Sequence, residues 1–258
     1  MSLLQDAEHA VLRDPWPDAP RLAFADAVAA TDPDRAAYIR AELAVLGAER
    51  AGKKAKASDV SSASKAYSGN WQRWMGGLEA VLPPGPPKVA FGRGFVEQVS
   101  AAAAWLLDHA PDVFERAPVL DLHVTELAGH EEAFFDAPWL SRIRALWLAE
   151  NKLGDRGAQC IASSPFLARV RLLDLGFNGI GVDGLDALAT STKLPSLRFV
   201  HLRGNRAPDP NYETDRQEDT EWGPISTNAS ALFLQRYPGC PWIGRYAADR
   251  VPRPGALL

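Results

Sequence analysis

The chain has 258 residues, of which 47% are hydrophobic and 23% are charged, a composition typical of a soluble globular protein with a buried core. Its formal net charge of −4 offers no basic field to neutralise phosphates, so nucleic acid is not an expected partner. Because the sequence shows no secretory leader and no apolar run of the roughly 18 residues that a membrane helix needs, we expect no membrane partner and a cytoplasmic location.

Three helices are predicted in the first fifty residues, where apolar side chains recur at helical spacing. They cover residues 3–13, about 18–30 and about 33–50. Asp14-Pro15-Trp16-Pro17 separates the first two, and Thr31-Asp32-Pro33 separates the second from the third. Proline is tolerated at the start of a helix but not in its interior, so these boundaries are consistent with three short helices packed as a small bundle.

The same segment carries a recognisable motif, Pro20-Arg21-Leu22-Ala23-Phe24-Ala25-Asp26, followed by Arg35-Ala36-Ala37-Tyr38-Ile39-Arg40. This motif resembles the bacterial repeat-companion domain, and the resemblance implies a helical domain ahead of a repeat array. The match departs from the family pattern at Val28-Ala29, where a tryptophan near Ala27 and a following acid are usual. Its charged residues are interpreted as an interhelical ion-pair network, with a binding patch as the alternative.

Two connecting segments follow. Residues 51–62 are small, polar and positively charged, which is typical of a flexible connector or of a frayed helix end. Residues 83–87, Pro-Pro-Gly-Pro-Pro, predict a stiff polyproline spacer, with docking to a proline-reading partner as the alternative. Residues 91–96 are interpreted as part of the stretch that joins the helices to the first strand of the repeats.

A repeat occupies residues 117–206. Its three clearest copies are Leu146-Trp147-Leu148-Ala149-Glu150-Asn151, Leu173-Asp174-Leu175-Gly176-Phe177-Asn178 and Val200-His201-Leu202-Arg203-Gly204-Asn205, and each asparagine follows the previous one by 27 residues. The two apolar residues of each copy share one face of a strand, so they predict the core. Apolar residues at helical spacing follow the first two copies, so each unit predicts a strand, a turn and a helix. The asparagines predict a ladder that satisfies backbone groups at the turns.

This pattern resembles the leucine-rich-repeat family, and the period of 27 is similar to that of the ribonuclease-inhibitor-like subclass. The resemblance implies an α/β fold: a short solenoid, with parallel strands on its concave face and helices on its convex face, preceded by the helical bundle. A degenerate earlier copy begins at Leu120, where Thr125 replaces the asparagine.

The C-terminal tail begins with residues 207–224, which are acidic and rich in proline and predict a long exposed loop. Residues 228–243 predict a capped helix and a bulky apolar stretch that covers the open end of the solenoid. A partner-binding role for Trp222 or Trp242 is the alternative. The expected domains are residues 1–82, the helical domain with its connector; residues 88–206, the solenoid; and residues 207–258, the acidic loop and cap.

The candidate binding surface consists of the outward strand positions and the turns that follow them. Stacking the repeats in register places on the concave face Asp121, His123, Trp147, Glu150, Asp174, Phe177, Phe199, His201 and Arg203. Aromatic residues mixed with both signs of charge are typical of the centre of a protein–protein interface, so a protein partner is expected. The alternative is that Trp147 and Phe199 pack on each other or on the tail.

Catalytic motifs are missing from the sequence: we find no phosphate-binding loop, metalloprotease helix, paired-cysteine motif or nucleophile elbow, and therefore expect no cofactor and no metal. An acid–base role for Asp174 beside the histidines is disfavoured because an open concave face is wet. The sequence favours a non-catalytic protein-interaction scaffold. The alternative is a regulatory subunit, or a processed substrate, of a bacterial signalling or defence system, handled at residues 51–62 or 207–224, and an enzyme ranks third.

Overall fold

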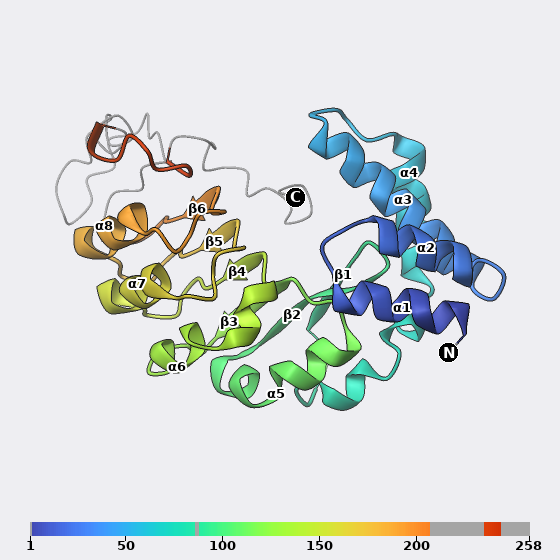
Figure 1. Cartoon of the computed structure of the whole chain (residues 1–258), viewed down its shortest axis with the longest axis horizontal. Coiled ribbons are helices and arrows are strands. Elements are labelled where there is room, and N and C mark those ends of the chain that lie inside the picture. Colours follow the sequence, from blue (N-terminus) through green and yellow to red (C-terminus); the bar gives the residue numbers. More distant parts are fainter. Residues whose placement is uncertain (1, 86–87, 207–234, 244–258) are drawn as a thin grey trace. The chain divides into compact units, whose positions relative to one another are not determined.

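The computed structural model describes residues 2–85, 88–206 and 235–243 (Figure 1). The α-helices are α1 (Leu3–Arg13), α2 (Ala19–Val28), α3 (Pro33–Arg50), α4 (Ala57–Ser68), α5 (Ala103–Arg116), α6 (Glu131–Phe135), α7 (Gly154–Ser163) and α8 (Val182–Thr190). The strands are β1 (Val89–Gly92), β2 (Phe95–Ala102), β3 (Asp121–Thr125), β4 (Ala145–Trp147), β5 (Leu172–Asp174) and β6 (Phe199–His201). Short 3-10 helices occupy η1 (Arg73–Met75), η2 (Leu78–Val81) and η3 (Pro138–Arg142).

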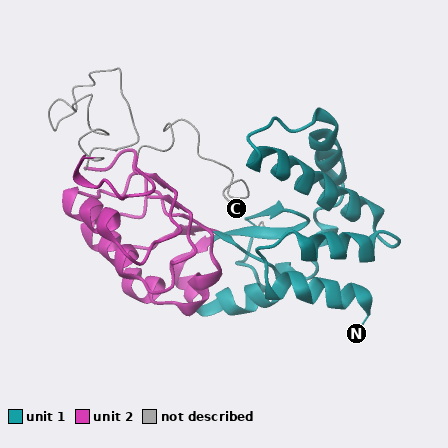
Figure 2. Cartoon of the chain, turned by 45° about the horizontal axis from the view of Figure 1, so that its top comes forward, with its two compact units in different colours: residues 1–100, 108–121, 253–258 teal, residues 101–107, 122–252 magenta. Residues whose placement is uncertain are grey.

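The chain forms two compact units (Figure 2). Within the described residues, unit 1 comprises residues 2–85, 88–100 and 108–121, and unit 2 comprises residues 101–107, 122–206 and 235–243. None of the described helices combines the length and the apolarity that crossing a membrane demands. The α/β class predicted from the sequence is confirmed.

Helices α1, α2 and α3 of unit 1 occupy the three segments for which the sequence predicts helices. Ser2 and Gln5 form a reciprocal capping box at the start of α1. Asp32 caps α3 by accepting a hydrogen bond from the Arg35 amide at 3.1 Å. The apolar faces of the three helices share one core, which includes Val11, Phe24 and Ile39.

The charged residues of the N-terminal motif take part in packing within unit 1. Arg40 pairs with Asp26 at 2.7 Å on the exposed side of α2 and α3. The side chain of Arg21 is fully buried and pairs with Glu97 of β2. Arg35 lies over the ring of Phe24, 4.8 Å from its centroid. Arg40 and Asp26 therefore form an interhelical ion pair, as the motif predicts, whereas Arg21 pairs with a strand and Arg35 packs on an aromatic ring.

Strands β1 and β2 form an antiparallel hairpin, which the sequence analysis did not anticipate. Its turn consists of Arg93 and Gly94, with φ of 51° and 91°, and two positive φ values match the turn type whose twist suits a two-residue hairpin. The turn lacks the usual Asn-Gly or Asp-Gly signature, so it was missed. A Cβ on Gly94 would lie 2.1 Å from Cγ1 of Ile39, so only glycine allows this close approach.

Arg93 explains why a residue other than glycine holds a left-handed conformation in this turn. Its fully buried guanidinium donates to Glu97 at 2.9 Å and to Asp18 at 2.8 Å, and also to the backbone carbonyl oxygens of Pro15 and Trp16. Burial by itself would raise the pKa of Asp18, but hydrogen bonds from Arg50 and Arg93 outweigh it and lower that pKa. The hairpin is thereby tied to the loop between α1 and α2.

Half of the segment expected to be a flexible connector or a frayed helix end is helical, since α4 begins at Ala57 and covers residues 57–62 of the range 51–62. The polar composition of this segment favours a connector, but α4 also has an apolar side that packs against α3. Ala63 is 4% exposed and belongs to a core cluster with Tyr38 and Trp74. Tertiary packing therefore stabilises a helix that composition alone does not predict.

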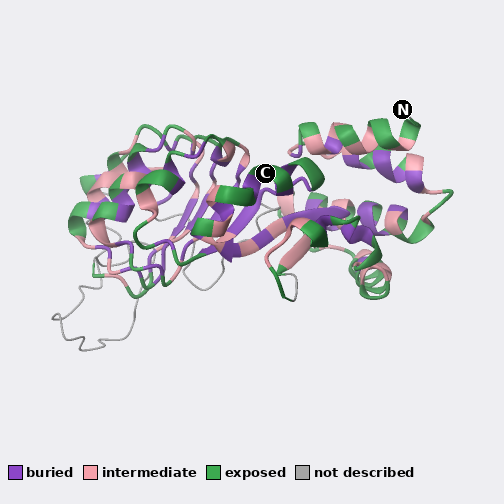
Figure 3. Ribbon diagram, turned by 90° about the horizontal axis from the view of Figure 1, so that it is seen from below, coloured by how far each residue is buried: buried purple, intermediate pink, exposed green. Residues whose placement is uncertain are grey.

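Unit 2 contains the repeats. Its strands follow the order β3-β4-β5-β6, and β4, β5 and β6 are parallel. Leu148, Leu175 and Leu202, the second apolar residue of each copy, are all at most 1% exposed. Figure 3 shows buried residues along these strands and on the inner sides of the helices. Helices α7 and α8 each return the chain between consecutive strands. The repeats that begin with β4 and β5 therefore each consist of a strand, a turn and a helix, as the spacing predicts.

The asparagines form hydrogen bonds from one repeat to the next. The backbone amide of Asn151 donates to Oδ1 of Asn178 at 2.9 Å, and the backbone amide of Asn178 donates to Oδ1 of Asn205 at 3.0 Å. The side-chain amide of Asn178 donates to the carbonyl oxygens of Leu148 and Gly176 at 2.8 and 3.1 Å. Each asparagine therefore satisfies backbone groups of its own turn and of a neighbouring turn.

The described part of the C-terminal tail, residues 235–243, contacts helix α8. Arg236 pairs with Asp186 of α8 at 2.6 Å, and Tyr237, Trp242 and Ile243 are buried. At 2% exposure, Trp242 presents no surface to a partner. Residues 207–224, including Trp222, and most of the helix predicted from residue 228 lie outside the described residues.

Candidate functional site

Four side chains stand in one row across the strands of unit 2, on the face opposite the leucines. They are His123 of β3, Trp147 of β4, Asp174 of β5 and His201 of β6, hereafter the strand row. Trp147 is the register partner of Asp174, and Asp174 is the register partner of His201. All four are half-buried, whereas the alternate strand residues Leu146, Leu173 and Val200 are buried. The strand row is thus the half-exposed face of the repeats, as alternation along a strand requires.

The first two members of the strand row stack on each other. The ring centroids of His123 and Trp147 lie 4.9 Å apart, with 23° between the ring planes. Burial lowers the pKa of His123 from 6.5, although the carboxylate of Asp174 acts in the opposite direction. His123 is therefore a neutral aromatic surface near pH 7, continuous with the indole ring.

The last two members of the strand row form an ordered acid–imidazole pair. Nδ1 of His201 lies 2.9 Å from Oδ1 of Asp174, and the same oxygen accepts a hydrogen bond from the Gly176 amide at 3.0 Å. Since Oδ1 is an acceptor, this pattern assigns a proton to Nδ1 of the imidazole. A Cβ on Gly176 would lie only 3.3 Å from the carboxylate oxygen, so the missing side chain leaves room for the pair.

Three further candidates lie just beyond the strands, where the chain turns. Glu150, Phe177 and Arg203 are all exposed, and Phe177 has 53% of its surface accessible. The Phe177 amide donates to the carbonyl oxygen of Arg203 at 2.8 Å, so these turns are linked in register. These residues lie beside the strand row but belong to the loops of the repeats.

One backbone conformation recurs at the turns. Positive φ values occur at Glu126, Glu150, Phe177 and Gly204, of 56°, 62°, 55° and 71°. A left-handed conformation costs a residue with a side chain about 1–2 kcal/mol. Only Gly204 avoids this cost, and the ring of Phe177 lies where a Cβ of residue 204 would be.

Two of the candidate binding residues are not accessible. Asp121 is 4% exposed and Phe199 is 2% exposed, so neither presents a side chain to solvent. Phe199 stands in register with Leu172 and Ala145, at the beginning of the strands, and that entire row is buried. Alternation along a strand assigns each residue to a face, but it does not indicate where along the strand that face is covered.

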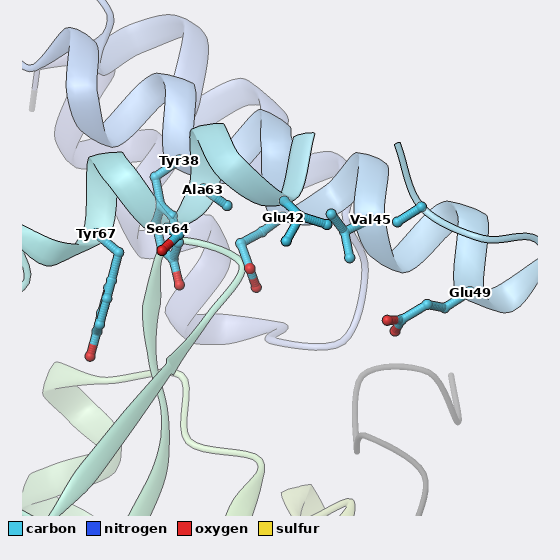
Figure 4. A pocket seen from close by; sticks show the side chains of 9 residues that line it. Tyr38, Glu42, Val45, Glu49, Ala63, Ser64 and Tyr67 are labelled. Carbon is cyan, nitrogen blue, oxygen red and sulfur yellow. The ribbon is translucent and has the colours of Figure 1, made fainter. Parts of the chain in front are cut away.

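Two further groups of polar residues in unit 1 come together in the structure without a sequence motif that predicts them. The buried group around Arg93 and Glu97 has a structural role, described above. A pocket between α3 and α4 (Figure 4) contains Tyr38, Glu42 and Glu49, whose spacing of four and then seven residues is the detectable signal that they share one side of a helix. Within the described residues, no group of three or more histidine, cysteine, aspartate or glutamate side chains could hold a metal ion.

Comparison with known families agrees with this architecture. Two segments match the model of the family described as leucine-rich repeat, residues 143–162 and residues 170–189. The first spans β4 and most of α7, and the second spans β5 and most of α8. The chain therefore contains two leucine-rich repeats, a module that commonly mediates protein–protein interaction. A search of curated proteins gave no match.

Proposed function

We propose that the chain is a non-catalytic scaffold that binds a protein partner through the concave face of its repeats, without a cofactor or a metal. The observation that carries the proposal is the strand row, in which aromatic and ionisable side chains stand side by side opposite the buried leucines. Tryptophan is enriched among the residues that dominate binding energy, and interface centres are rich in aromatic side chains.

The geometry favours binding over catalysis. Oδ1 of Asp174 accepts from both Gly176 and His201, so this carboxylate holds the local backbone and fixes the orientation of the imidazole. The stacked rings of His123 and Trp147 provide a broad, neutral and rigid contact surface. Rigid aromatic surfaces lose little conformational entropy on binding, which favours affinity.

We also infer that the N-terminal helices form a repeat-companion domain of a bacterial, cytoplasmic protein. This inference rests on the motif from Pro20 to Arg40 and on the contacts of its charged residues. The described tail supports a capping role, since its apolar side chains are buried and Arg236 pairs with α8. A cap of this kind protects the last repeat from solvent.

The test is affinity capture with the full-length protein from a lysate of its native cells, followed by quantitative mass spectrometry. Wild-type protein is compared with Trp147→Ala, which removes the centre of the strand row, and with Arg203→Glu, which reverses an adjacent exposed charge. Lys193→Glu is the matched control, since Lys193 is exposed and lies in the loop after α8. We expect at least one protein to be retained by wild type and Lys193→Glu and lost with both other variants. Retention of every captured protein by Trp147→Ala and Arg203→Glu would exclude the proposal.

A further inference from the structure

The repeats carry a second row of outward side chains, at the turns that follow the strands. Its members stand three residues after a member of the strand row, and they are Glu126, Glu150 and Phe177, hereafter the turn row. All three are exposed and hold a left-handed backbone, with φ of 56°, 62° and 55°. Equivalent positions with the same backbone conformation direct their side chains alike, so the turn row forms one exposed edge of the repeats.

Hydrogen bonds between the turns place the members of the turn row side by side. The backbone amide of Leu127 donates to Oδ1 of Asn151 at 2.9 Å, which joins the first turn to the second. The backbone amide of Glu150 donates to the carbonyl oxygen of Gly176 at 3.0 Å, which joins the second turn to the third. Adjacent strands of a sheet are about 4.8 Å apart, so one side chain of a partner can contact two neighbouring members of the turn row.

The ring of Phe177 is open on the side of Glu150. Gly204, in the turn that follows, covers the other side, since a Cβ on Gly204 would lie 2.3 Å from Cδ1 of the ring. Phe177 is nevertheless 53% exposed, so its accessible surface lies away from Gly204, toward the turn of Glu150 and the solvent. The face of an aromatic ring carries negative charge density, which attracts a cation.

The two carboxylates of the turn row have no cationic partner within the chain. Glu126 and Glu150 are exposed, and among the described residues neither forms an ion pair or a side-chain hydrogen bond. Like charges on neighbouring strands repel each other, so a cation beside them is favourable. Asp174 is not counted here, because its carboxylate already pairs with His201.

The exposed cations of the same repeats limit how much positive charge a partner can bring. Arg203 stands at an outward position next to Gly204, on the far side of the Phe177 ring. Lys152 lies beyond the buried Asn151. Both repel a second cation, so a single positive charge near Glu150 fits this edge better than a run of basic residues.

The stacked rings of the strand row provide the neighbouring apolar surface. Burial lowers the pKa of His123, so this imidazole is neutral near pH 7 and does not repel a cation. Together with Trp147, on which it stacks, it forms a flat aromatic surface. The outward residue after Trp147 is Ala149, which is too small to cover the rings, so apolar side chains of a partner can reach them.

We propose that the turn row binds an arginine side chain of the protein partner. Its guanidinium group lies on the open side of the Phe177 ring and pairs with the carboxylate of Glu150. Apolar residues on either side of this arginine contact the stacked rings of Trp147 and His123. This inference rests on the proposed function, since it names the chemistry that the same face of the repeats recognises in its partner.

The site favours a guanidinium group over an ammonium group. A guanidinium group is planar, so it stacks on an aromatic ring and at the same time donates two hydrogen bonds to a carboxylate. An ammonium group is compact and strongly hydrated, so it loses more solvation when it approaches a ring. We therefore expect arginine to bind more tightly than lysine.

Titration of the 258-residue protein, followed by nuclear magnetic resonance, tests the proposal. The probes are the acetylated and amidated peptide Gly-Leu-Arg-Leu-Gly and its analogues with lysine or citrulline in place of arginine. Citrulline has nearly the shape of arginine but no charge. We expect the backbone amide signals of Glu150 and Phe177 to shift saturably with the arginine peptide. We expect its affinity to exceed that of the citrulline peptide at least about fivefold, which corresponds to about 1 kcal/mol, with the lysine peptide between them.

Three results would overturn the proposal. They are equal affinities for the arginine and citrulline peptides, a lysine peptide that binds as tightly as the arginine peptide, and no shift of these amide signals at millimolar peptide.

Variants locate the binding to the turn row. Glu150→Gln keeps the size of the side chain and removes its charge, so it should weaken the arginine peptide at least about threefold and leave the citrulline peptide unchanged. Phe177→Leu keeps an apolar side chain and removes the ring, so it should also reduce the preference for arginine. The matched control is Asp183→Asn, which removes an exposed carboxylate from α8 and should bind all three peptides as wild type does. Far-ultraviolet circular dichroism confirms that each variant is folded, and equal losses in Glu150→Gln and Asp183→Asn would refute the site.

This result is separable from that of the affinity capture. A captured partner that is lost with Trp147→Ala, together with equal affinities for the arginine and citrulline peptides, would leave the scaffold role in place and overturn arginine recognition alone. A preference for arginine that depends on Glu150, in a protein whose captured partners all tolerate Trp147→Ala and Arg203→Glu, would support the arginine site and exclude the proposed scaffold role.

Discussion

Replacement of Asn178 by alanine isolates the contribution of the asparagine ladder to the stability of the repeats. The side chain of Asn178 makes four hydrogen bonds to backbone groups. It accepts from the amides of Asn151 at 2.9 Å and Leu153 at 3.4 Å, and it donates to the carbonyl oxygens of Leu148 at 2.8 Å and Gly176 at 3.1 Å. Alanine fits the same backbone but leaves all four groups without this partner.

The expected magnitude follows from burial. Asn178 is 2% exposed, so water does not reach the groups that it leaves behind. Each buried polar group without a partner costs about 1–3 kcal/mol, and because the backbone relaxes in part we expect a total loss of about 3–5 kcal/mol. Asn205 is the matched control, since it makes four equivalent bonds, to Asn178, Ile180, Leu175 and Leu202. Asn205 is only half-buried, so water replaces part of these bonds and we expect Asn205→Ala to cost about 1–2 kcal/mol.

Urea denaturation measures both losses as shifts in the transition midpoint at a constant slope. The two compact units need not unfold together, so hydrogen exchange of peptides from residues 145–205 assigns the transition to the repeats. A larger loss for Asn178→Ala than for Asn205→Ala supports the reasoning. Equal losses, or a loss below about 1 kcal/mol for Asn178→Ala, would show that the ladder does not stabilise the repeats through buried hydrogen bonds.

Two further predictions concern the turns and the strand row. Gly204 has a φ of +71°, and a Cβ at this position would lie 2.3 Å from Cδ1 of Phe177, so Gly204→Ala should lower the free energy of unfolding by about 2–4 kcal/mol. Gly179 has the same φ but no atom within 4 Å of its Cβ position, so Gly179→Ala should lower the free energy of unfolding by only about 1 kcal/mol. Equal losses in urea titrations would rule out a contribution from the Phe177 contact. Burial lowers the pKa of His123 below 6.5 in the folded protein, so as the pH falls the imidazole is protonated in the unfolded chain before it is protonated in the folded one. The contribution of His123 to the free energy of unfolding is therefore fully present above pH 6.5 and decreases as the pH falls. His123→Phe keeps an aromatic ring on Trp147 and should lose less stability than wild type between about pH 7.5 and about pH 5.5; identical pH profiles would contradict this assignment.

Much of unit 2 was predictable because its sequence pattern repeats every 27 residues. The spacing of 27 residues predicts that Leu148, Leu175 and Leu202 are interior residues of neighbouring units, and the structure confirms their burial. The same period predicts that Asp174 and His201 are register neighbours, since each occupies the middle position of its motif. The existence of the strand row therefore follows from counting residues, and its ring stacking and imidazole orientation follow from the structure.

Accessibility along the strands was not predictable in the same way. Phe199 and His201 have the same alternation on β6, yet one is buried and the other is half-buried. Asp121 has an ionisable side chain and is nevertheless buried. A two-residue period distinguishes the faces of a strand but contains no information about what covers each end of it.

In unit 1 the capping and proline residues of the sequence predict where the first three helices begin and end, but they do not predict how the helices pack. Proline and aspartate mark the boundaries of α1, α2 and α3, because capping and the restricted φ of proline act within a few residues. The pocket between α3 and α4 escaped notice because α4 has the composition of a connector, and its helical state depends on contacts with Tyr38 and Trp74.

The amino-acid sequence alone determined the repeat, its strand–turn–helix unit and the boundaries of the first three helices, since periodicity and capping are properties of neighbouring residues. Only the tertiary structure decided which outward side chains remain accessible, that Arg93 holds a left-handed turn through Asp18 and Glu97, and that Glu49 shares a pocket with Tyr67. Each of these depends on residues that are distant in sequence, and burial and partner choice are set by which segments meet in space.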